Sequence, residues 1–412
     1  MMRRLAAAWL AVVLGGPRCS PGHQGGDPGE DAIVDPGDVP GDADAGEAVA
    51  DAPDADDLAD VAEEGIPGFS CADTGSYVNP PAGSIGHTEI SRWKGGRSAA
   101  LTINFDDSTP GQALIGVPAM VARGLTGTWF VNPGTDSYLD HQDVWETYAP
   151  ASFQELANHS MDHAGAADYA DAEYQIGEAA GIIVSAYPPT RSPLMGFNRG
   201  GGTTWNVTED QIQSLLEEFH CIERLYSSGI YPATPADTMF TEVKEHLSSG
   251  GWYDDWGNIH FHGICNPEDT VNCVCDTPGT SSNCREYGGG VNNGAVSSAQ
   301  FEAFLDALVA DGYFAEDVWI AGFGSAHKYQ SERNAARVVM VPDTEEPIVL
   351  CLTSTLDPVL YDEALTLTTL VADDWTLCVA EQGGASLPCG MAGGAATFDA
   401  VPDRGAVVLR PE

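Results

Sequence analysis

The sequence predicts an α/β protein built on a parallel sheet or distorted barrel, followed by a small all-β extension. Between residues 99 and 321, short β-prone runs alternate with helical patterns, which is typical of parallel strands joined by helices. After Pro342 the pattern changes to apolar residues in alternation, which is typical of antiparallel strands. A length of 412 residues and a hydrophobic fraction of 43% are ample for such a core.

The α/β part begins with a run that ends in two aspartates. In a parallel sheet or barrel the carboxyl ends of the strands meet at one mouth, so polar residues that follow strands should gather there. In chain order we expect a strand at 99–105, a helix at 113–123, a strand at 127–132, helical stretches from 153–157 and at 172–186, a helix at 300–310 and a strand at 318–321.

The extension should contain only strands. Cys378 and Cys389 flank a glycine-rich turn there, so we expect a local disulfide between them. The predicted strands are 348–352, 365–371, 375–380 and 406–409.

The amino terminus has the features of a secretory signal peptide at residues 1–20. A short basic start precedes the apolar run 5–16, which is too short to span a bilayer. Cys19 stands where a bacterial lipoprotein cysteine would stand, but Pro17 and Arg18 are poor residues before such a cleavage site. We therefore expect a secreted or cell-envelope protein, with a lipid anchor through Cys19 as the alternative.

Composition restricts the partners and the redox state. The formal charge of −44, from 61 acidic and 17 basic residues, excludes an electrostatic surface for nucleic acid. Ten cysteines in an exported chain indicate disulfides.

Residues 27–64 contain no Lys or Arg, and 21–68 should be a solvated tether, with calcium binding as the weaker alternative. A folded domain at 69–342 and a β domain at 343–412 would follow.

The first chemical motif is Asn104-Phe105-Asp106-Asp107, at the end of a predicted buried strand. Because side chains alternate along a strand, the two carboxylates point in different directions and can do different work. A strand-terminal Asp is equally typical of a helix cap.

The second motif is His159-Ser160-Met161-Asp162-His163. If this stretch is helical, the spacing places both imidazoles on one face, and an Asp oxygen would complete three ligands for a divalent metal ion. Two histidines at this spacing are more often surface or core residues.

These motifs, in this order, resemble the polysaccharide deacetylases, known as carbohydrate esterase family 4 or the NodB homology domain. The resemblance runs from about Trp93 to about Arg337. It is carried by Arg92-Trp93-Lys94-Gly95-Gly96, by the runs 100–107, 127–131 and 158–163, and by the closing segments 318–321 and 329–333.

The resemblance implies a distorted barrel with a metal at its mouth. Asp107, His159 and His163 become the metal ligands, Asp106 the general base, and Ser160 a residue that supports the loop beside the ligands. The implied cofactor is a divalent ion, with zinc as the default.

The segment 258–264 resembles the strand that bears the family's acid histidine. His262 is nearer the carboxyl end, so it is the predicted acid, and His260 a neighbouring or packing residue. The Asp that would orient this acid could be Asp254 or Asp255, or the more distant Asp237.

The Arg-Pro segment of the family is degraded. Its nearest match, 197–202, keeps Arg199 as the candidate that orients the base, while the glycines could present N–H groups to an anion. A flexible turn with a solvated Arg is the alternative. Trp205, Trp252 and Trp256 could stack on sugar rings, although core packing is the commoner use.

Four cysteines follow the acid histidine in an insertion rich in Gly and Asn. Export favours two disulfides among Cys265, Cys273, Cys275 and Cys284 over a zinc knot.

The resemblance implies a metal-dependent hydrolase that removes acetyl groups from a polysaccharide, with no obligate protein partner. The rival hypothesis is an inactive carbohydrate-binding or structural module on the same barrel, since the Arg-Pro segment is degraded and the orienting Asp is unplaced. The β extension could bind carbohydrate or stabilise the barrel.

Overall fold

The structure is a computed structural model that describes residues 71, 75, 77–225, 227–229, 235–266, 268, 273–275, 284–286 and 295–412. The predicted signal peptide, Cys19 and the acidic tether lie outside these residues. Within the described part of the chain, no helix has both the length and the apolar character needed to cross a bilayer.

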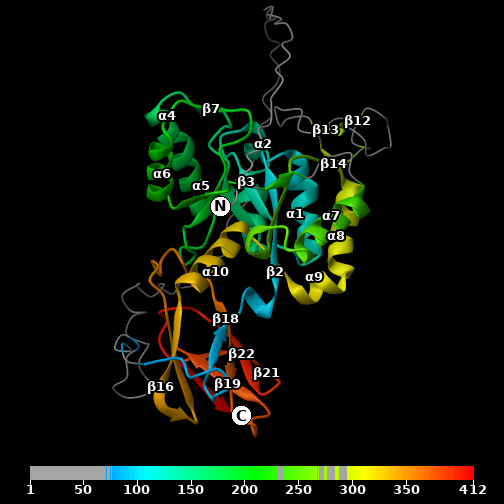
Figure 1. Cartoon of the computed structure of the whole chain (residues 1–412). Helices are drawn as coiled ribbons and strands as arrows, with labels where there is room; N and C mark the ends of the chain where they lie inside the picture. Colours follow the sequence, from blue (N-terminus) through cyan, green and yellow to red (C-terminus); the bar gives the residue numbers. More distant parts are fainter. Residues whose placement is uncertain are drawn as a thin grey trace, which may run out of the picture. The chain divides into compact units, whose positions relative to one another are not determined.

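An eight-stranded parallel sheet forms the centre of the α/β part (Figure 1). Its strand order is β8-β6-β4-β3-β2-β10-β9, with β15 paired to β2, which confirms the predicted fold class. The strands are β2 (Ala99–Asp106), β3 (Thr128–Val131), β4 (Glu155–Asn158), β6 (Met195–Phe197), β8 (Cys221–Glu223), β9 (Ser228–Gly229), β10 (Trp256–Phe261) and β15 (Val318–Ala321).

Strand β2 is buried along its whole length, and it has neighbours on both edges. One edge pairs with β10, and the other is shared by β15 and then β3. The start of the helix after β15 closes onto this side of the sheet. There the Phe323 amide donates to Thr128 Oγ1 at 2.7 Å, and the Gly324 amide to the Glu155 carboxylate at 2.9 Å. The sheet is therefore a curled, incomplete barrel.

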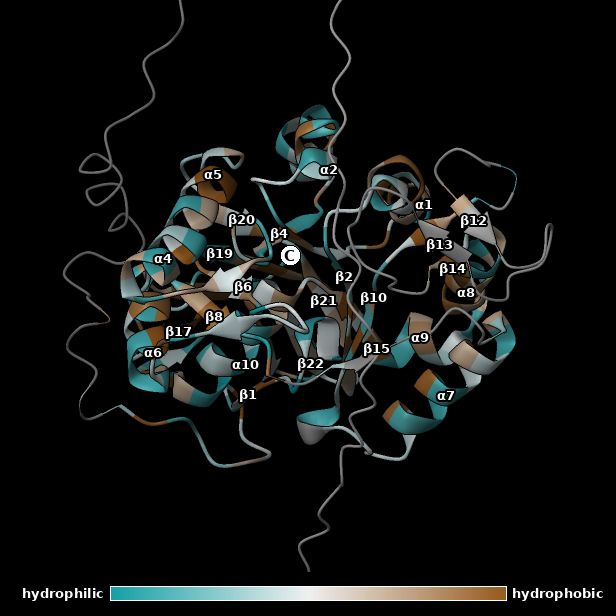
Figure 2. Cartoon of the chain, turned by 90° about the horizontal axis from the view of Figure 1, so that it is seen from above, coloured by the Kyte–Doolittle hydropathy of each residue, from teal (hydrophilic) through white to brown (hydrophobic). Residues whose placement is uncertain are grey.

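Helices cover the sheet in two groups, with α4, α5 and α6 on one side and α7, α8 and α9 on the other (Figures 1 and 2). Their buried residues are apolar, as in α8, where Phe301 packs against Phe105 and Phe261 of the sheet. The helices are α1 (Val117–Ala122), α2 (Asp136–Leu139), α3 (Ala149–Ala151), α4 (Tyr169–Glu173), α5 (Ala179–Ser185), α6 (Glu209–Glu218), α7 (Ala236–Ser248), α8 (Ser298–Ala310), α9 (Gly312–Asp317) and α10 (Phe323–Ala335).

Short helical turns and ribbons complete the α/β part. Wider π-helical turns lead into α1, α3 and α5, so the helices predicted at 113–123 and 172–186 are present as composite helices. The helical stretch predicted from 153–157 is wrong, because Glu155–Asn158 is the buried strand β4. The turns are Gln112–Gly116, Val144–Tyr148, Tyr174–Glu178, Lys94–Gly96 and Tyr253–Asp255, and the ribbons pair β5 (Gly165–Ala166) with β7 (Thr204–Trp205), β11 (Ile264–Cys265) with β14 (Val296–Ser297), and β12 (Cys273–Cys275) with β13 (Cys284–Glu286).

The carboxyl-terminal part is all β, as predicted. One sheet has the order β16-β17-β23-β19-β20 and the other β1-β18-β22-β21, so β1 joins this part from the amino-terminal side. Strand β16 crosses the boundary expected at 342, and the division into two domains stays a prediction. The strands are β1 (Thr88–Ile90), β16 (Arg337–Glu345), β17 (Ile348–Thr353), β18 (Leu365–Leu370), β19 (Cys378–Gln382), β20 (Ala385–Leu387), β21 (Cys389–Ala392), β22 (Ala395–Ala400) and β23 (Val407–Pro411).

The two parts share one apolar cluster. Trp93 and Tyr329, from the segment before β2 and from α10, pack with Leu350 and Leu367 of the β strands. The Tyr329 hydroxyl also accepts a hydrogen bond from the Thr366 amide and donates to the carbonyl of Ser91. The extension is therefore packed against residues of the α/β part.

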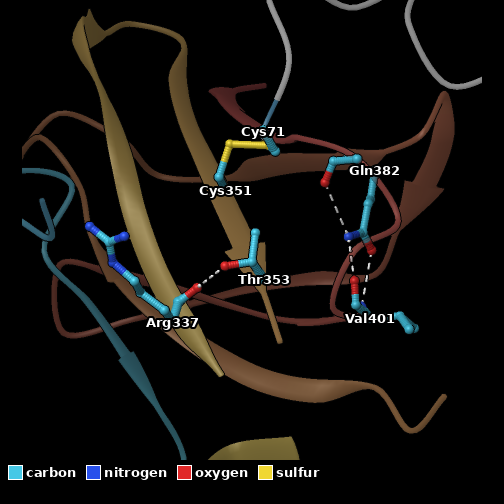
Figure 3. The surroundings of a disulfide bond; sticks show 7 residues. Cys71, Arg337, Cys351, Thr353, Gln382 and Val401 are labelled. Atoms are coloured by element: carbon cyan, nitrogen blue, oxygen red, sulfur yellow. Dashed lines mark hydrogen bonds between the residues drawn. A yellow bond between two sulfur atoms is a disulfide. The ribbon is translucent and has the colours of Figure 1, made fainter. Parts of the chain in front are cut away.

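Disulfides tie the β part together. Cys378 pairs with Cys389, which confirms the predicted local bridge. A second bridge joins Cys71 to Cys351 on β17 (Figure 3), across 280 positions of sequence. The spacing of the cysteines in the sequence did not predict this bridge.

The insertion after β10 contains one described disulfide, between Cys265 and Cys273, in line with pairing inside the insertion. The backbone register places Cys275 opposite Cys284, but the side chains of these two lie outside the described residues. Cys221 is buried with a free thiol.

Candidate metal centre

Three side chains meet at the carboxyl ends of β2 and β4. Asp107, His159 and His163 each offer one ligand atom, and these atoms lie within 4.8 Å of one another. The Nε2 atoms of His159 and His163 lie 3.3 and 3.5 Å from Asp107 Oδ1. The structure therefore brings together the three residues that the sequence suggested as ligands.

The segment 159–163 is a loop and not a helix, so the expected helical facing of the two histidines is wrong. Ser160 and His163 have φ values of 67° and 60°, which lie in the left-handed region. Local hydrogen bonds hold this backbone: Ser160 N donates to Asn158 Oδ1 at 2.8 Å, and His163 N donates to Ser160 Oγ at 3.2 Å. Ser160 thus contacts the loop that it was expected to support.

The donor set fits a divalent cation. His159 Nδ1 lies 3.0 Å from the carbonyl oxygen of Asn198, and a carbonyl only accepts, so the ring hydrogen belongs on Nδ1. The lone pair of Nε2 then faces an oxygen of the Asp107 carboxylate. A cation between these two acceptors, either a proton or a metal ion, makes the arrangement favourable. Metal-binding histidines commonly donate their second ring N–H to a carbonyl in this way.

Electrostatics keep these groups in the protonation states that a metal requires. Burial raises the pKa of Asp107, but the hydrogen bond and charge of His159 outweigh burial and leave this pKa below its usual value. Burial, assisted by His159, lowers the pKa of His163. A carboxylate and a neutral imidazole are the ligating forms.

Asp106 lies outside this set of three and binds Arg224, a residue that the sequence did not suggest. Arg224 Nη1 and Nη2 donate to the two Asp106 oxygens at 2.8 and 2.5 Å. Both residues are 4% exposed, and the guanidinium lies 4.0 Å from the centre of the Phe130 ring. Burial raises the pKa of Asp106, but Arg224 and neighbouring histidines outweigh it and hold this pKa well below its usual range.

The prediction that Arg199 orients the base is therefore wrong in its geometry. Arg199 forms ion pairs with Glu209 at the start of α6 and with Glu223 at the end of β8. Arg224 follows β8 directly, so its position after a strand was the signal that could have revealed it.

The glycine run beside Arg199 lies close to the three candidate metal ligands. Gly200 has a φ of +79°, and a Cβ added there would lie 2.5 Å from His163 Nε2. Gly201 has nothing within 4 Å of such a Cβ. Glycine at position 200 is thus required by its backbone and by the space that His163 occupies.

His260 and His262 lie at the carboxyl end of β10, and each offers a ligand atom within 4.8 Å of Asp106. His260 Nδ1 lies 2.9 Å from Ser227 Oγ, and burial lowers the pKa of His260 to about 4. The carbonyl of His262 accepts a hydrogen bond from Gln112 Nε2. Both histidines share the mouth with Asp106, so the choice of His262 as acid stays a prediction.

The aspartates expected to orient the acid lie elsewhere. Asp254 and Asp255 precede β10, whereas His262 follows it, and six strand residues span ~20 Å. Asp254 instead binds Arg333 and Arg92. These two candidates are wrong on geometry.

The last candidate, Asp237, lies in the first turn of α7 and accepts a hydrogen bond from the neighbouring Thr238 amide. This contact leaves its predicted role unsupported.

The three tryptophans considered for sugar stacking pack within the protein. Trp256 lies 6.0 Å from Trp93 and 5.4 Å from Phe323, centre to centre. Trp252 packs on His246 and Trp205 on Phe197. All three are partly buried and pack against the apolar clusters, which supports the packing alternative.

The fold and the site define a class: a curled parallel α/β barrel with one carboxylate and two imidazoles at the carboxyl mouth of its strands. No protein-family profile matches the chain. The chain is 21% identical to a gellan lyase from Bacillus sp. over 355 residues, which are 79% of this chain and 13% of that enzyme.

Several solved structures that are similar to this chain are of the family that the sequence resembles. They include a peptidoglycan deacetylase from Bacillus subtilis (14% identity, 58% of this chain and 93% of that chain, TM-score 0.34) and a family 4 carbohydrate esterase from Streptomyces lividans (15%, 52% and 88%, 0.31). A family 4 pseudoenzyme from Bacillus anthracis is also similar (14%, 40% and 54%, 0.31). With TM-scores this low, the proposals below depend on the residues of this chain.

Proposed function

We propose that this chain is an exported metal-dependent hydrolase that removes acetyl groups from a carbohydrate polymer. The observation that carries the proposal is the convergence of Asp107, His159 and His163 beside a second, ionised carboxylate, Asp106. A binding module has no need for a buried carboxylate held in one orientation next to a metal-ligand set.

Asp107, His159 and His163 would hold the ion, which we propose is zinc because imidazole and carboxylate ligands suit it. When bound, a divalent ion lowers the pKa of water toward ~7 and polarises an acetyl carbonyl. The Asn198 carbonyl fixes the ring of His159, and Ser160 fixes the loop that carries His163. The chain thereby supplies both ligands and their orientation.

Asp106 would accept the proton of the attacking water. Arg224 holds both of its oxygens, so it fixes the direction of the carboxylate and keeps it ionised. A carboxylate with so low a pKa would hold that proton only briefly and would release it to solvent as the products leave. His262 would protonate the leaving amine or alcohol, giving acetate and a deacetylated sugar.

The second candidate function is an inactive carbohydrate-binding or structural module on the same barrel. The observation that favours it concerns the Asp expected to orient His262. The candidate Asp254 lies at the other end of β10 from His262. Against it, Arg224 supplies the contact to Asp106 that the altered Arg199 segment does not. We therefore favour the enzyme.

Export and the substrate class belong to the same proposal. The bridges Cys71–Cys351 and Cys378–Cys389 support an oxidising compartment, and an acidic chain of charge −44 suits a neutral polymer better than an anionic one. The β part, at 343–412, would stabilise the barrel through the cluster it shares with Trp93 and Tyr329.

Acetate release tests the proposal. Protein loaded with one equivalent of zinc is incubated with acetylated chitin, xylan, peptidoglycan and exopolysaccharide fragments, and acetate is measured with and without chelator. We expect release from at least one polymer, abolished by the chelator and restored by zinc. Binding to a polymer without acetate release from any of them would favour the inactive module.

A further inference from the structure

A second group of ligand-type side chains lies beside the first. Asp106, His260 and His262 each offer one ligand atom, and these atoms lie within 4.8 Å of one another. This group repeats the composition of the Asp107 set, one carboxylate and two imidazoles, which suits a divalent ion of borderline softness. The proposed reaction uses Asp106 and His262 but gives His260 no task.

His260 is held as a metal-binding histidine is held. Its backbone is fixed in β10 between Asn104 of β2 and Gly229 of β9. Its Nδ1 lies 2.9 Å from Ser227 Oγ; with the ring hydrogen on Nδ1, the hydroxyl accepts it and Nε2 keeps a free lone pair. The Asn198 carbonyl holds His159 by the same ring nitrogen.

The ring of His262 completes the group, with its centre 5.1 Å from that of His260 and the two planes at 76°. Rings at this angle can direct their nitrogens to a common point without stacking on each other. The two imidazoles and the Asp106 carboxylate therefore surround one small region of the mouth.

Arg224 decides how strongly this group can bind a cation. Its two hydrogen bonds use one acceptor position on each Asp106 oxygen, and a carboxylate has about four such positions, so acceptor positions remain. The guanidinium charge offsets that of Asp106, however, whereas within the described part of the chain Asp107 pairs with His159 and His163 and with no arginine or lysine. The second group should bind a cation more weakly than the first.

We propose that Asp106, His260 and His262 form a second, weaker divalent-metal site, and that an ion in this site inhibits the reaction. Inhibition follows because an ion there takes the lone pairs with which Asp106 and His262 would exchange protons. Only the inhibition depends on the proposed function, since the binding of a second ion can be measured without any substrate.

A zinc titration tests the proposal. Metal-free protein is dialysed against rising free zinc, and bound zinc and acetate release are measured on the same samples. We expect the first equivalent to raise acetate release. A second equivalent should bind at free zinc roughly tenfold higher or more, as expected from one opposing charge nearby, and acetate release should fall as it binds.

Three variants test which residues bind the second equivalent of zinc. His260→Asn should keep the first equivalent, lose the second and resist inhibition by excess zinc. Ser227→Ala should keep both but weaken the second by about 10- to 100-fold, the effect of losing a partner that orients a ligand. His87→Asn, at a histidine whose ring contacts Pro80 and Glu89, should behave as wild type.

Each outcome decides the proposal. A wild-type protein that binds one equivalent at every zinc concentration would overturn it, as would a His260→Asn variant that still binds two or is still inhibited. If His260→Asn does not fold, the proposal is overturned instead by a Ser227→Ala variant that binds the second equivalent of zinc as tightly as the wild type does. Two bound equivalents without acetate release from any protein would refute the deacetylase proposal and leave the second site standing.

Discussion

Replacement of Arg224 by Met is the perturbation that best separates the observed site from the one expected from sequence. Arg224 and Asp106 form a buried pair with two hydrogen bonds at 2.8 and 2.5 Å, and each residue is 4% exposed. Arg224→Met leaves the Asp106 carboxylate buried without a partner. Loss of one member of a buried pair costs about 3–5 kcal/mol of unfolding free energy.

Arg199→Met is the matched control, because Arg199 was the residue expected to hold the base. Its partner Glu209 is 64% exposed, and exposed pairs contribute about 0–1 kcal/mol. The second partner, Glu223, is less exposed, so we expect the cost to fall at the upper end of that range. Arg199→Met should also leave the position of Asp106 unchanged.

Urea unfolding at pH 7, with the disulfides intact and followed by tryptophan fluorescence, measures the difference. A double variant, Arg224→Met with Asp106→Asn, should recover part of the lost stability because it removes the unpaired charge. Acetate release should fall by roughly 10²-fold in Arg224→Met, as for a misplaced catalytic group. Equal losses of stability and activity in Arg224→Met and Arg199→Met would refute this reading of the site.

Two further predictions concern single residues near the site and near the junction with the β part. Gly200→Ala should weaken zinc binding by about tenfold or more, because its Cβ would meet His163 Nε2 at 2.5 Å; Gly201→Ala, measured by the same calorimetric titration, should not. Burial raises the pKa of Glu332 to about 8 from 4.5, so the native state holds a proton that the unfolded state releases, and stability should fall as pH rises from 4.5 to 8. Glu332→Gln should flatten this decline, on the order of 2 kcal/mol, in unfolding curves taken at pH 5 and pH 8; a parallel decline in both proteins would contradict the assignment.

The parts of the site that sequence could predict are those that follow strands. Asp106 ends β2, Asp107 follows it, and His159 follows β4. The carboxyl ends of parallel strands meet whatever the order of the strands in the sheet. The convergence of these residues could therefore be predicted from the alternation of strands and helices alone. The all-β extension was likewise visible in its alternating residues.

The parts that could not be predicted depend on strand order and on local backbone. Arg224 reaches Asp106 from β8, at the edge of the sheet, and no spacing along the chain reveals that contact. Met161 and its neighbours form a loop because Ser160 and His163 take left-handed φ values, which residue preferences disfavour. The short run 153–157 became strand β4 through burial between β3 and β6.

The central claim is that the neighbouring residues Asp106 and Asp107 do different work, and one paired measurement tests it most directly. Bound zinc and acetate release are determined on Asp106→Asn and Asp107→Ala. Asp107→Ala should lose zinc and activity together, because it removes a ligand. Asp106→Asn should keep the first equivalent of zinc while acetate release drops by roughly 10²- to 10⁴-fold, the range for loss of a general base. Near-wild-type acetate release by Asp106→Asn, or loss of its first zinc, would contradict the division of labour.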